Sequence, residues 1–255
     1  LPQRAKQGGA AQNFFYLIES ADMDTYDFAA LADQDDLWFG EKLLRACQVL
    51  SATAAQGYSS NVWAFWPDGR KRFVNKSAPQ RQWDYLFESA GPGCSFVLDK
   101  TLMVMLQEFI SRHRQALNNI FLHDWFIYAF ASVHGYRWSI DPAPGLLYRQ
   151  HRANVLGVNS GWSAGWGRLR MLVDGRAFHQ VRVLSCLLEL DRDPFVQRVN
   201  RLDRGAFLRL ACNVHRCRRR LQDQVVLLFV SCCLAASGIK NKRLSTQEPV
   251  RSIDG

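Results

Sequence analysis

The sequence predicts an α/β fold followed by a helical region, on three observations. Runs with strand character alternate with helical patterns up to about residue 151, which is typical of a sheet whose strands are joined by helical crossovers. From Trp162 to about Gly238 the spacing is helical only. The charge also changes: residues 1–167 hold 15 Lys/Arg and 15 Asp/Glu, whereas residues 168–255 hold 17 and 8, so the last third carries the whole excess of +9.

The composition, 48% hydrophobic and 22% charged over 255 residues, indicates one large globular domain or one domain with an appendage. We expect a first domain over residues 1–158 and a basic, mainly helical region with a polar tail over residues 159–255. The second region would face something anionic.

The first elements lead to a group of acids. Residues 13–21 have helical spacing, and residues 26–32 predict a buried strand that ends on acids. A helix is expected over residues 40–55. Its apolar stripe would comprise Leu43, Leu44, Cys47 and Leu50.

The later elements include a hairpin. Residues 59–66 and 71–75 flank an Asp68-Gly69 turn. A Gly/Pro-rich turn and a strand follow over residues 91–99. The remaining expectations are helices over 99–114 and 124–135, the second closed by Gly135, and two short strands over 136–141 and 145–151.

The cysteines and the start of the chain bear on its origin. Seven cysteines without a CxxC pair favour a reducing, cytoplasmic compartment and buried thiols. The polar, basic start has no signal-peptide features and no Met, so we expect the chain to begin partway into a longer protein.

Asp33, Asp35 and Asp36 stand out, because three carboxylates within four residues repel one another. In open α/β sheets, ligands bind beyond the carboxyl ends of strands. A hard divalent cation such as Mg²⁺ would make this crowding tolerable there. A solvated acidic turn explains the three residues about equally well, so they leave both interpretations open.

The surrounding residues carry a resemblance. The segment "ADQDDLWFGEKL" (32–43) resembles the Asp-x-Asp signature of family 2 glycosyltransferases, which have the GT-A fold. It is most similar to the rhamnosyltransferase branch that builds bacterial surface polysaccharides such as O-antigen. "GPGCSFVLDKTL" (91–102), residues 123–157 and "NFFYLIESA" (13–21) are similar in matching order, so the resemblance covers about residues 8–158.

The start of that family has no counterpart here. The family opens with a strand, a Thr-Tyr-Asn-Gly-like loop and two further βα units that bind the nucleotide. We therefore expect the first portion to be missing and a sheet edge to be unpaired. Residues 1–255 alone would then be less soluble, or melt less cooperatively, than an extended protein.

The resemblance implies an inverting transfer from a nucleoside-diphosphate sugar, dTDP-rhamnose in this branch, to a lipid-linked saccharide or polysaccharide. Asp35 would bind Mg²⁺ or Mn²⁺ that bridges the diphosphate oxygens of the leaving group. Asp33 would reach the ribose, or the metal through water. Asp36 would either support the site or cap the helix that starts near Phe39.

Asp124 matches the family's catalytic base, which takes the proton of the acceptor hydroxyl. Without the resemblance, an Asp at a helix N-terminus is more commonly a cap or a partner of the helix dipole. His123 would either support the site or lie at the surface.

His151 matches a family histidine near the metal and diphosphate, although a lone His is as readily structural. Arg149 would point to the same face of a strand and bind phosphate, or be a solvated strand-end residue. Gly93 would let the backbone approach a ligand or form a turn. Cys94 is expected to be a small packed residue. Trp38 and Trp125 would stack on a sugar, but core positions are favoured for both.

Residues 215–238 place five basic residues before an apolar run, Val225–Ala236. This run is shorter than the roughly 20 residues that span a bilayer. It predicts either a core helix in a cap over the catalytic domain or an interfacial helix on an anionic membrane surface. In the second case the leaflet would contact Arg216, Arg218, Arg219 and Arg220 and would bury Val226, Leu227, Phe229 and Val230.

A nucleic-acid partner is not expected, because the basic run lacks interleaved aromatics and a reading motif. The interpretation favoured overall is a metal-dependent inverting glycosyltransferase that is peripheral on the inner face of the plasma membrane. The competing interpretation is a truncated, non-catalytic remnant that binds a membrane surface or a partner.

Overall fold

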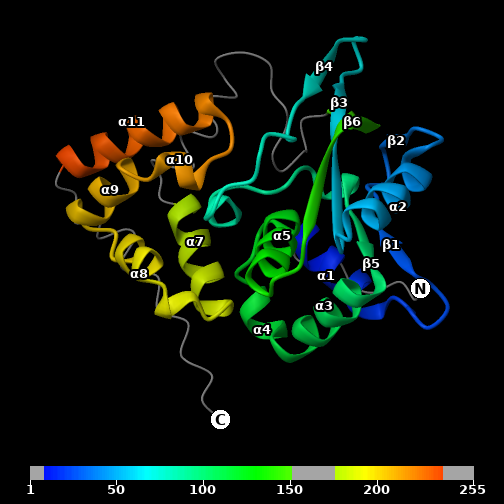
Figure 1. Cartoon of the computed structure of the whole chain (residues 1–255), viewed down its shortest axis with the longest axis horizontal. Helices are drawn as coiled ribbons and strands as arrows, with labels where there is room; N and C mark the ends of the chain where they lie inside the picture. The colour runs from blue at the N-terminus through cyan, green and yellow to red at the C-terminus, as the bar shows by residue number, and fades with distance from the viewer. Residues whose placement is uncertain (1–8, 151–175, 238–255) are drawn as a thin grey trace. The chain divides into compact units, whose positions relative to one another are not determined.

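The computed structural model in Figure 1 describes residues 9–150 and 176–237. The chain forms two units: residues 1–78 with 89–159, and residues 79–88 with 160–255. The domain boundary expected at residue 158 lies outside the described residues. The sequence did not suggest that residues 79–88 group with the second unit.

The first unit is an α/β domain with a mixed sheet. The strand order is β1-β5-β3-β6-β2, and β4 pairs with β3. Among the described strands, β3 and β6 alone pair in parallel, and the other pairs are antiparallel. Its elements are α1 (Ala10–Ser20), β1 (Phe28–Ala30), β2 (Leu37–Trp38), α2 (Lys42–Thr53), β3 (Gly57–Phe65), β4 (Lys71–Val74), η2 (Gly93–Ser95), β5 (Val97–Asp99), α3 (Lys100–Arg112), α4 (Arg114–Leu117), α5 (His123–Val133) and β6 (Trp138–Arg149).

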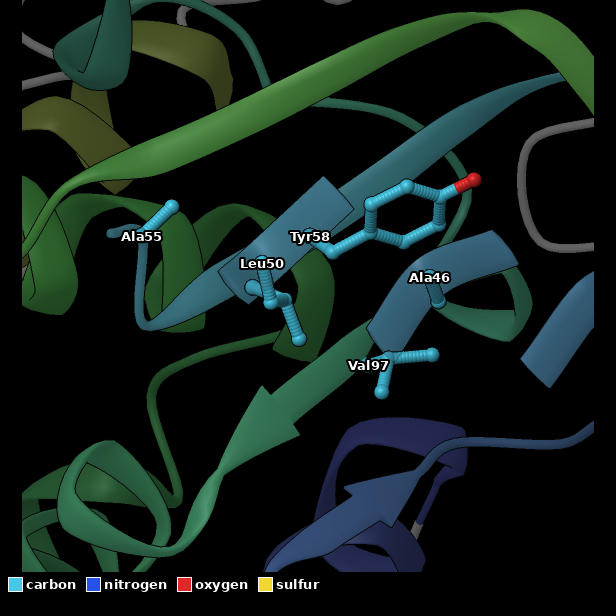
Figure 2. Packing of buried hydrophobic residues seen from close by; sticks show 5 residues of the cluster. All are labelled: Ala46, Leu50, Ala55, Tyr58 and Val97. Carbon is cyan, nitrogen blue, oxygen red and sulfur yellow. The ribbon is translucent and has the colours of Figure 1, made fainter. Parts of the chain in front are cut away.

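Helices cover both faces of this sheet (Figure 1). On one face, α2 packs on β3 and β5 through a buried cluster of Ala46, Leu50, Ala55, Tyr58 and Val97, shown in Figure 2. On the other face, Phe96 and the α5 residue Tyr128 both make edge contacts with the Trp138 ring. The predicted α/β fold is confirmed.

Several predicted elements are confirmed with their local causes. Gly69, with φ of +85°, makes the tight hairpin turn between β3 and β4, because glycine adopts positive φ without strain. The Asp99 side chain caps α3 by accepting a hydrogen bond from the Leu102 N–H at 2.8 Å. Gly135, with φ of +78°, follows the end of α5 as expected.

Two predictions near the acids are wrong in detail. The strand expected over residues 26–32 is only β1, and Phe28 is 37% exposed because β1 lies at the edge of the described sheet. In α2, Leu43 and Leu44 are exposed, so the predicted apolar stripe has the wrong phase. The side of α2 that faces the sheet carries Lys42, Ala46 and Leu50.

The two short strands expected over residues 136–151 form one strand, β6. Pro142 and Pro144 lie between the two expected strands, and proline cannot donate a ladder hydrogen bond. In the structure both prolines lie in one continuous strand at a bulge, where the β3–β6 register shifts on both sides of Asn61. The side-chain amide of Asn61 donates to the Pro142 carbonyl at 2.9 Å and so gives this carbonyl a hydrogen-bond partner at the bulge.

The second unit is helical where described, as predicted. Its elements are η1 (Asp84–Leu86), α7 (Arg176–Leu187), η3 (Leu190–Arg192), α8 (Pro194–Asn200), α9 (Arg204–Ala211), α10 (Val214–Cys217) and α11 (Leu221–Ser237). No helix within residues 9–150 and 176–237 is long and apolar enough to cross a bilayer.

The segment 79–88 joins these helices through an aromatic stack. Trp83 stacks on Phe195 of α8 with ring centroids 3.8 Å apart. The guanidinium of Arg216 lies 4.2 Å from the Trp83 ring centroid. The backbone N–H of Trp83 donates to the Arg216 carbonyl at 2.9 Å, so the basic run is fixed to this segment.

Arg219 forms a buried ion-pair network with the same segment. Its guanidinium lies 3.2 Å from a carboxylate oxygen of both Asp84 and Glu88, and its N–H donates to Glu88 at 2.7 Å. Arg219 is 3% exposed. The expectation that the four arginines lie at a leaflet is therefore wrong for Arg219, because its charge is paired inside the unit.

Two other expectations for this region need correction. Leu227 and Val230 are buried within the helical unit, so they do not belong to a lipid-facing surface. All seven cysteines are free, but only two, Cys94 and Cys217, are buried, so the expectation of generally buried thiols is wrong.

Candidate active site

The candidate site begins in the loop between β1 and β2, where Asp33, Asp35 and Asp36 lie. One potential ligand atom from each of Asp33, Asp36 and Cys94 lies within 4.8 Å of the others. The acids thus follow a strand, as expected. The structure gathers Asp36 with Asp33, whereas sequence reasoning gave the metal to Asp35 and Asp33.

Asp36 does not cap α2, because that helix starts at Lys42 rather than near Phe39. Instead Asp36 Oδ1 accepts the backbone N–H of Arg149 at 2.9 Å. Oδ2 is buried and has no nitrogen or oxygen donor among the described residues. The side chain is therefore held at one oxygen and available at the other.

Burial and mutual repulsion raise the pKa values of Asp33 and Asp36. Burial, and then the charges of Asp36 and Asp35, raise the pKa of Asp33 to about 6. Burial raises the pKa of Asp36, although the Cys94 thiol and the Arg149 N–H partly offset it. Such a cluster is stabilised when a cation replaces the protons.

The donor set fits a hard cation through its carboxylates alone. Burial and the two neighbouring carboxylates raise the pKa of Cys94 well above its ordinary value, so the thiol stays protonated. Mg²⁺ and Mn²⁺ prefer oxygen ligands, whereas thiolates suit softer metals. Asp33 and Asp36 would therefore hold the ion, and Cys94 packs beside them, as predicted for a small packed residue.

Lys42 is a site residue that sequence reasoning missed. Its amine donates to the Cys94 carbonyl at 2.8 Å and lies 3.3 Å from the centroid of the Trp38 ring. Burial lowers its pKa to about 8, although Cys94 and Asp36 oppose the shift. Lys42 precedes Ala46 and Leu50 by one and two helical turns, and this spacing was the available signal for its burial.

Arg149 anchors the acid loop from the end of β6. Its Nε donates to the Asp35 carbonyl at 2.9 Å, and its guanidinium lies 4.7 Å from the Phe65 ring centroid. These contacts assign Arg149 a role in fixing the loop, next to its backbone bond to Asp36. His151, predicted to lie near the metal, is outside the described residues.

The η2 turn connects the acid cluster to the N-terminus of α5. Cys94 of this turn lies against Asp33 and Asp36, while the Cα of Gly93 faces the ring of His123. A Cβ at Gly93 would lie only 2.3 Å from His123 Nε2, so no side chain fits there. This close approach places the first turn of α5 beside the η2 turn that carries Cys94.

His123 is half-buried, and its Nε2 is buried without a hydrogen-bond partner among the described residues. Its ring stacks on Phe14 with centroids 3.8 Å apart, and burial lowers its pKa to about 3. It therefore carries no charge at neutral pH. Its position against Gly93 makes it a spacer that holds the start of α5.

Asp124 is the second residue of α5. Its Oδ1 accepts the N–H of Trp125 at 2.8 Å, and Ser89 and Lys76 also stabilise the ionised carboxylate. Burial is the larger effect and raises its pKa to about 6. A carboxylate of this pKa can accept a proton near neutral pH.

The two tryptophans have different surroundings. Trp125 is 6% exposed, in agreement with a core position. Trp38 is half-buried, and Lys42 occupies one face of its ring. Stacking of a sugar on that face would require the lysine to move.

The comparisons with known proteins point to one activity. No protein-family model matches the chain. The chain is 39% identical over 232 residues to the dTDP-rhamnosyl transferase RfbG of Shigella flexneri, a match that covers 90% of this chain and 79% of that protein.

Proposed function

Because the chain belongs to the rhamnosyltransferase family of glycosyltransferases that includes RfbG, we propose that it transfers rhamnose from dTDP-rhamnose to a saccharide acceptor. The observation that carries this proposal is the η2 turn, where Cys94 lies against the acid cluster and the adjacent Gly93 contacts His123, the residue before Asp124. The predicted GT-A-like α/β fold agrees with the mixed sheet and the helical region that follows it.

A divalent cation, Mg²⁺ or Mn²⁺, would be held by Asp33 and Asp36, with Asp35 in the same loop. When bound, such an ion neutralises the negative charge that develops on the departing diphosphate. The support for this assignment is the raised pKa of both acids and the buried Oδ2 of Asp36. Lys42 adds a positive charge beside the same acids.

Asp124 would take the proton from the acceptor hydroxyl as that oxygen attacks the anomeric carbon. The bond from the anomeric carbon to the diphosphate oxygen breaks in the same step, and the diphosphate leaves with the electron pair. Attack from the face opposite the leaving group inverts the anomeric configuration. His123, which is neutral and held by Phe14, would keep Asp124 in position.

The acceptor would be a lipid-linked saccharide, reached at the inner face of the plasma membrane. The support is the positive charge of the last third of the chain and the apolar residues that α11 exposes. Asp124 and the acid cluster lie in the first unit, so the proposed transfer step does not depend on where the acceptor is reached.

The test is a transfer assay with dTDP-rhamnose, Mn²⁺ and a lipid-linked saccharide. We expect release of dTDP together with a rhamnosylated product of inverted anomeric configuration, determined by NMR. Chelation by EDTA should stop the release, and added Mn²⁺ should restore it. Release that is unaffected by EDTA would remove the metal from the proposal, and retained configuration would remove the single displacement.

The non-catalytic remnant remains the competing interpretation. It predicts that the 255-residue chain binds neither dTDP nor dTDP-rhamnose in the presence of Mn²⁺. Titration calorimetry with dTDP separates the two interpretations before any acceptor is identified.

A further inference from the structure

An apolar stripe runs along one side of α11. Leu221, Val225, Leu228, Phe229 and Cys232 follow one another at intervals of three and four residues, which places them on the same face of the helix. All five are exposed, Leu221 by 74% and Phe229 by 64%. The buried residues of the helix, Leu227, Val230, Ser231 and Ala235, pack within the helical unit.

This face is unusual for a water-exposed surface. Isolated exposed apolar residues are ordinary, but a contiguous row on one helix marks a surface that binds something. The only charged residue in α11 is Asp223. Over its described length of 17 residues the helix does not qualify as long and apolar enough to cross a bilayer, and it is long enough to lie along its surface.

The charges around α11 favour an anionic occupant. Arg218 and Arg220 precede the helix, whereas Arg219 between them is paired within the unit. On and beside α9, which packs along α11, three further arginines are exposed: Arg201, Arg204 and Arg209. Basic residues beside an apolar stripe match the arrangement of a helix in an anionic lipid interface.

We propose that α11 lies flat in the interface of an anionic bilayer, with the stripe from Leu221 to Cys232 at the boundary of the acyl chains. This deepens the proposed function, on which it rests for the membrane-bound acceptor, by naming the face that contacts lipid. It also replaces the arginine run as the principal contact, since Arg219 is paired within the unit.

A second copy of the chain is the other occupant to consider. A symmetric dimer places the same patch of both subunits together. Two copies meeting through α11 would bring their arginine-rich flanks toward one another, and like charges oppose that contact. An anionic leaflet supplies the opposite charge, so lipid is the better fit.

The test is co-sedimentation of the 255-residue chain with vesicles, in the absence of donor and acceptor. We expect strong binding to vesicles that contain phosphatidylglycerol and weak binding to phosphatidylcholine alone. Phe229→Ser should weaken binding at least about tenfold, because it removes a large apolar side chain from the interface. Phe229→Leu should retain most of the binding.

The matched control is Leu44→Ser. Leu44 of α2 is 63% exposed, close to the 64% of Phe229, but it lies on the first unit. The Leu44→Ser variant should therefore bind vesicles as strongly as the parent chain. Equal binding by Phe229→Ser and the parent chain would overturn the inference, as would a dimer of the parent chain that Phe229→Ser converts to a monomer in sedimentation without lipid.

The failure of this inference can be told from failure of the proposed function. Transfer to a short, water-soluble saccharide should be the same for Phe229→Ser and the parent chain, because α11 holds none of the candidate site residues. If the parent chain binds vesicles through Phe229 but transfers nothing, the enzymatic proposal alone is wrong.

Discussion

A Cβ on Gly93 would lie 2.3 Å from Nε2 of His123, a contact that real side chains do not make. His123 cannot easily withdraw, because its Nε2 is buried and its ring stacks on Phe14 with centroids 3.8 Å apart. Gly93 is adjacent to Cys94, which contacts the acid cluster, and His123 is adjacent to Asp124. One glycine thus sets the spacing between the two halves of the candidate site.

Gly93→Ala should therefore destabilise the protein by about 1–3 kcal/mol, the usual cost of overpacking, and lower transfer further by displacing α5. The measurement is urea unfolding followed by circular dichroism, with transfer assayed under conditions where the variant is folded. Gly40→Ala is the control, because a Cβ at Gly40 meets nothing within 4 Å. Equal stability of Gly93→Ala and Gly40→Ala would mean that the packing at η2 is looser than described.

Asp36→Asn should weaken Mn²⁺-dependent binding of dTDP by about 10- to 100-fold, if Asp36 holds the ion. The neutral amide keeps the size of the side chain and can still accept the Arg149 N–H through its oxygen. Titration calorimetry with and without Mn²⁺ measures the effect, and Asp35→Asn is the informative comparison. A larger loss for Asp35→Asn than for Asp36→Asn would return the metal to the residue assigned from sequence.

Asp124→Asn should lower transfer by at least about 10²-fold while dTDP binding is retained. The raised pKa of Asp124, about 6, makes the sign of the pH effect clear. The base works only when ionised, so the activity of the parent chain should fall as the pH drops below about 6. The variant should lose this dependence in its residual activity.

Two further measurements distinguish Asp124 as the base: the effect of Mn²⁺ on the pH profile and the stability of Asp124→Asn. Asp33 also has a pKa of about 6, but its protonation competes with metal, so excess Mn²⁺ should shift that part of the pH profile and leave the part due to Asp124. The stability effect has the opposite sign. Since folding raises the pKa of Asp124, the stability that its protonated form contributes is lost as the pH rises through about 6. Asp124→Asn should therefore be more stable than the parent chain at pH 7.5, despite its lower activity.

The sequence predicted the parts of the site that depend on local pattern. The acids after β1, the hairpin turn at Gly69 and the start of α5 near Asp124 follow from strand, turn and helix signals that span a few residues. Resemblance to a family then gave those residues roles. The roles of Asp33, Asp35 and Asp124 remain predictions until they are tested.

The features that the sequence did not predict depend on contacts between residues far apart in the chain. The burial of Lys42 depends on Cys94, 52 residues later in the chain, and Arg219 pairs with Asp84, 135 residues earlier. The phase of α2 was misread because leucines suggested the buried side, whereas the packing against β3 selected the side with Ala46. Such choices are made by tertiary packing, which local periodicity does not report.

The basic run yields the last prediction, because its charges have two different environments. Arg219 is buried between Asp84 and Glu88, whereas Arg209 on α9 is exposed. Arg219→Met leaves two carboxylates buried without their cation, which should cost about 3–5 kcal/mol. Arg209→Met should change the stability by no more than about 0.5 kcal/mol.

Urea unfolding followed by circular dichroism at 222 nm, where helices dominate the signal, measures the stability of both variants. A variant that replaces Arg219, Asp84 and Glu88 together by apolar residues of similar volume should recover most of the loss, because no buried charge remains. If Arg219→Met is as stable as Arg209→Met, the ion-pair network does not hold segment 79–88 to the helices. Vesicle binding by folded Arg219→Met should match that of the parent chain, because a paired, buried arginine has no charge to offer a leaflet.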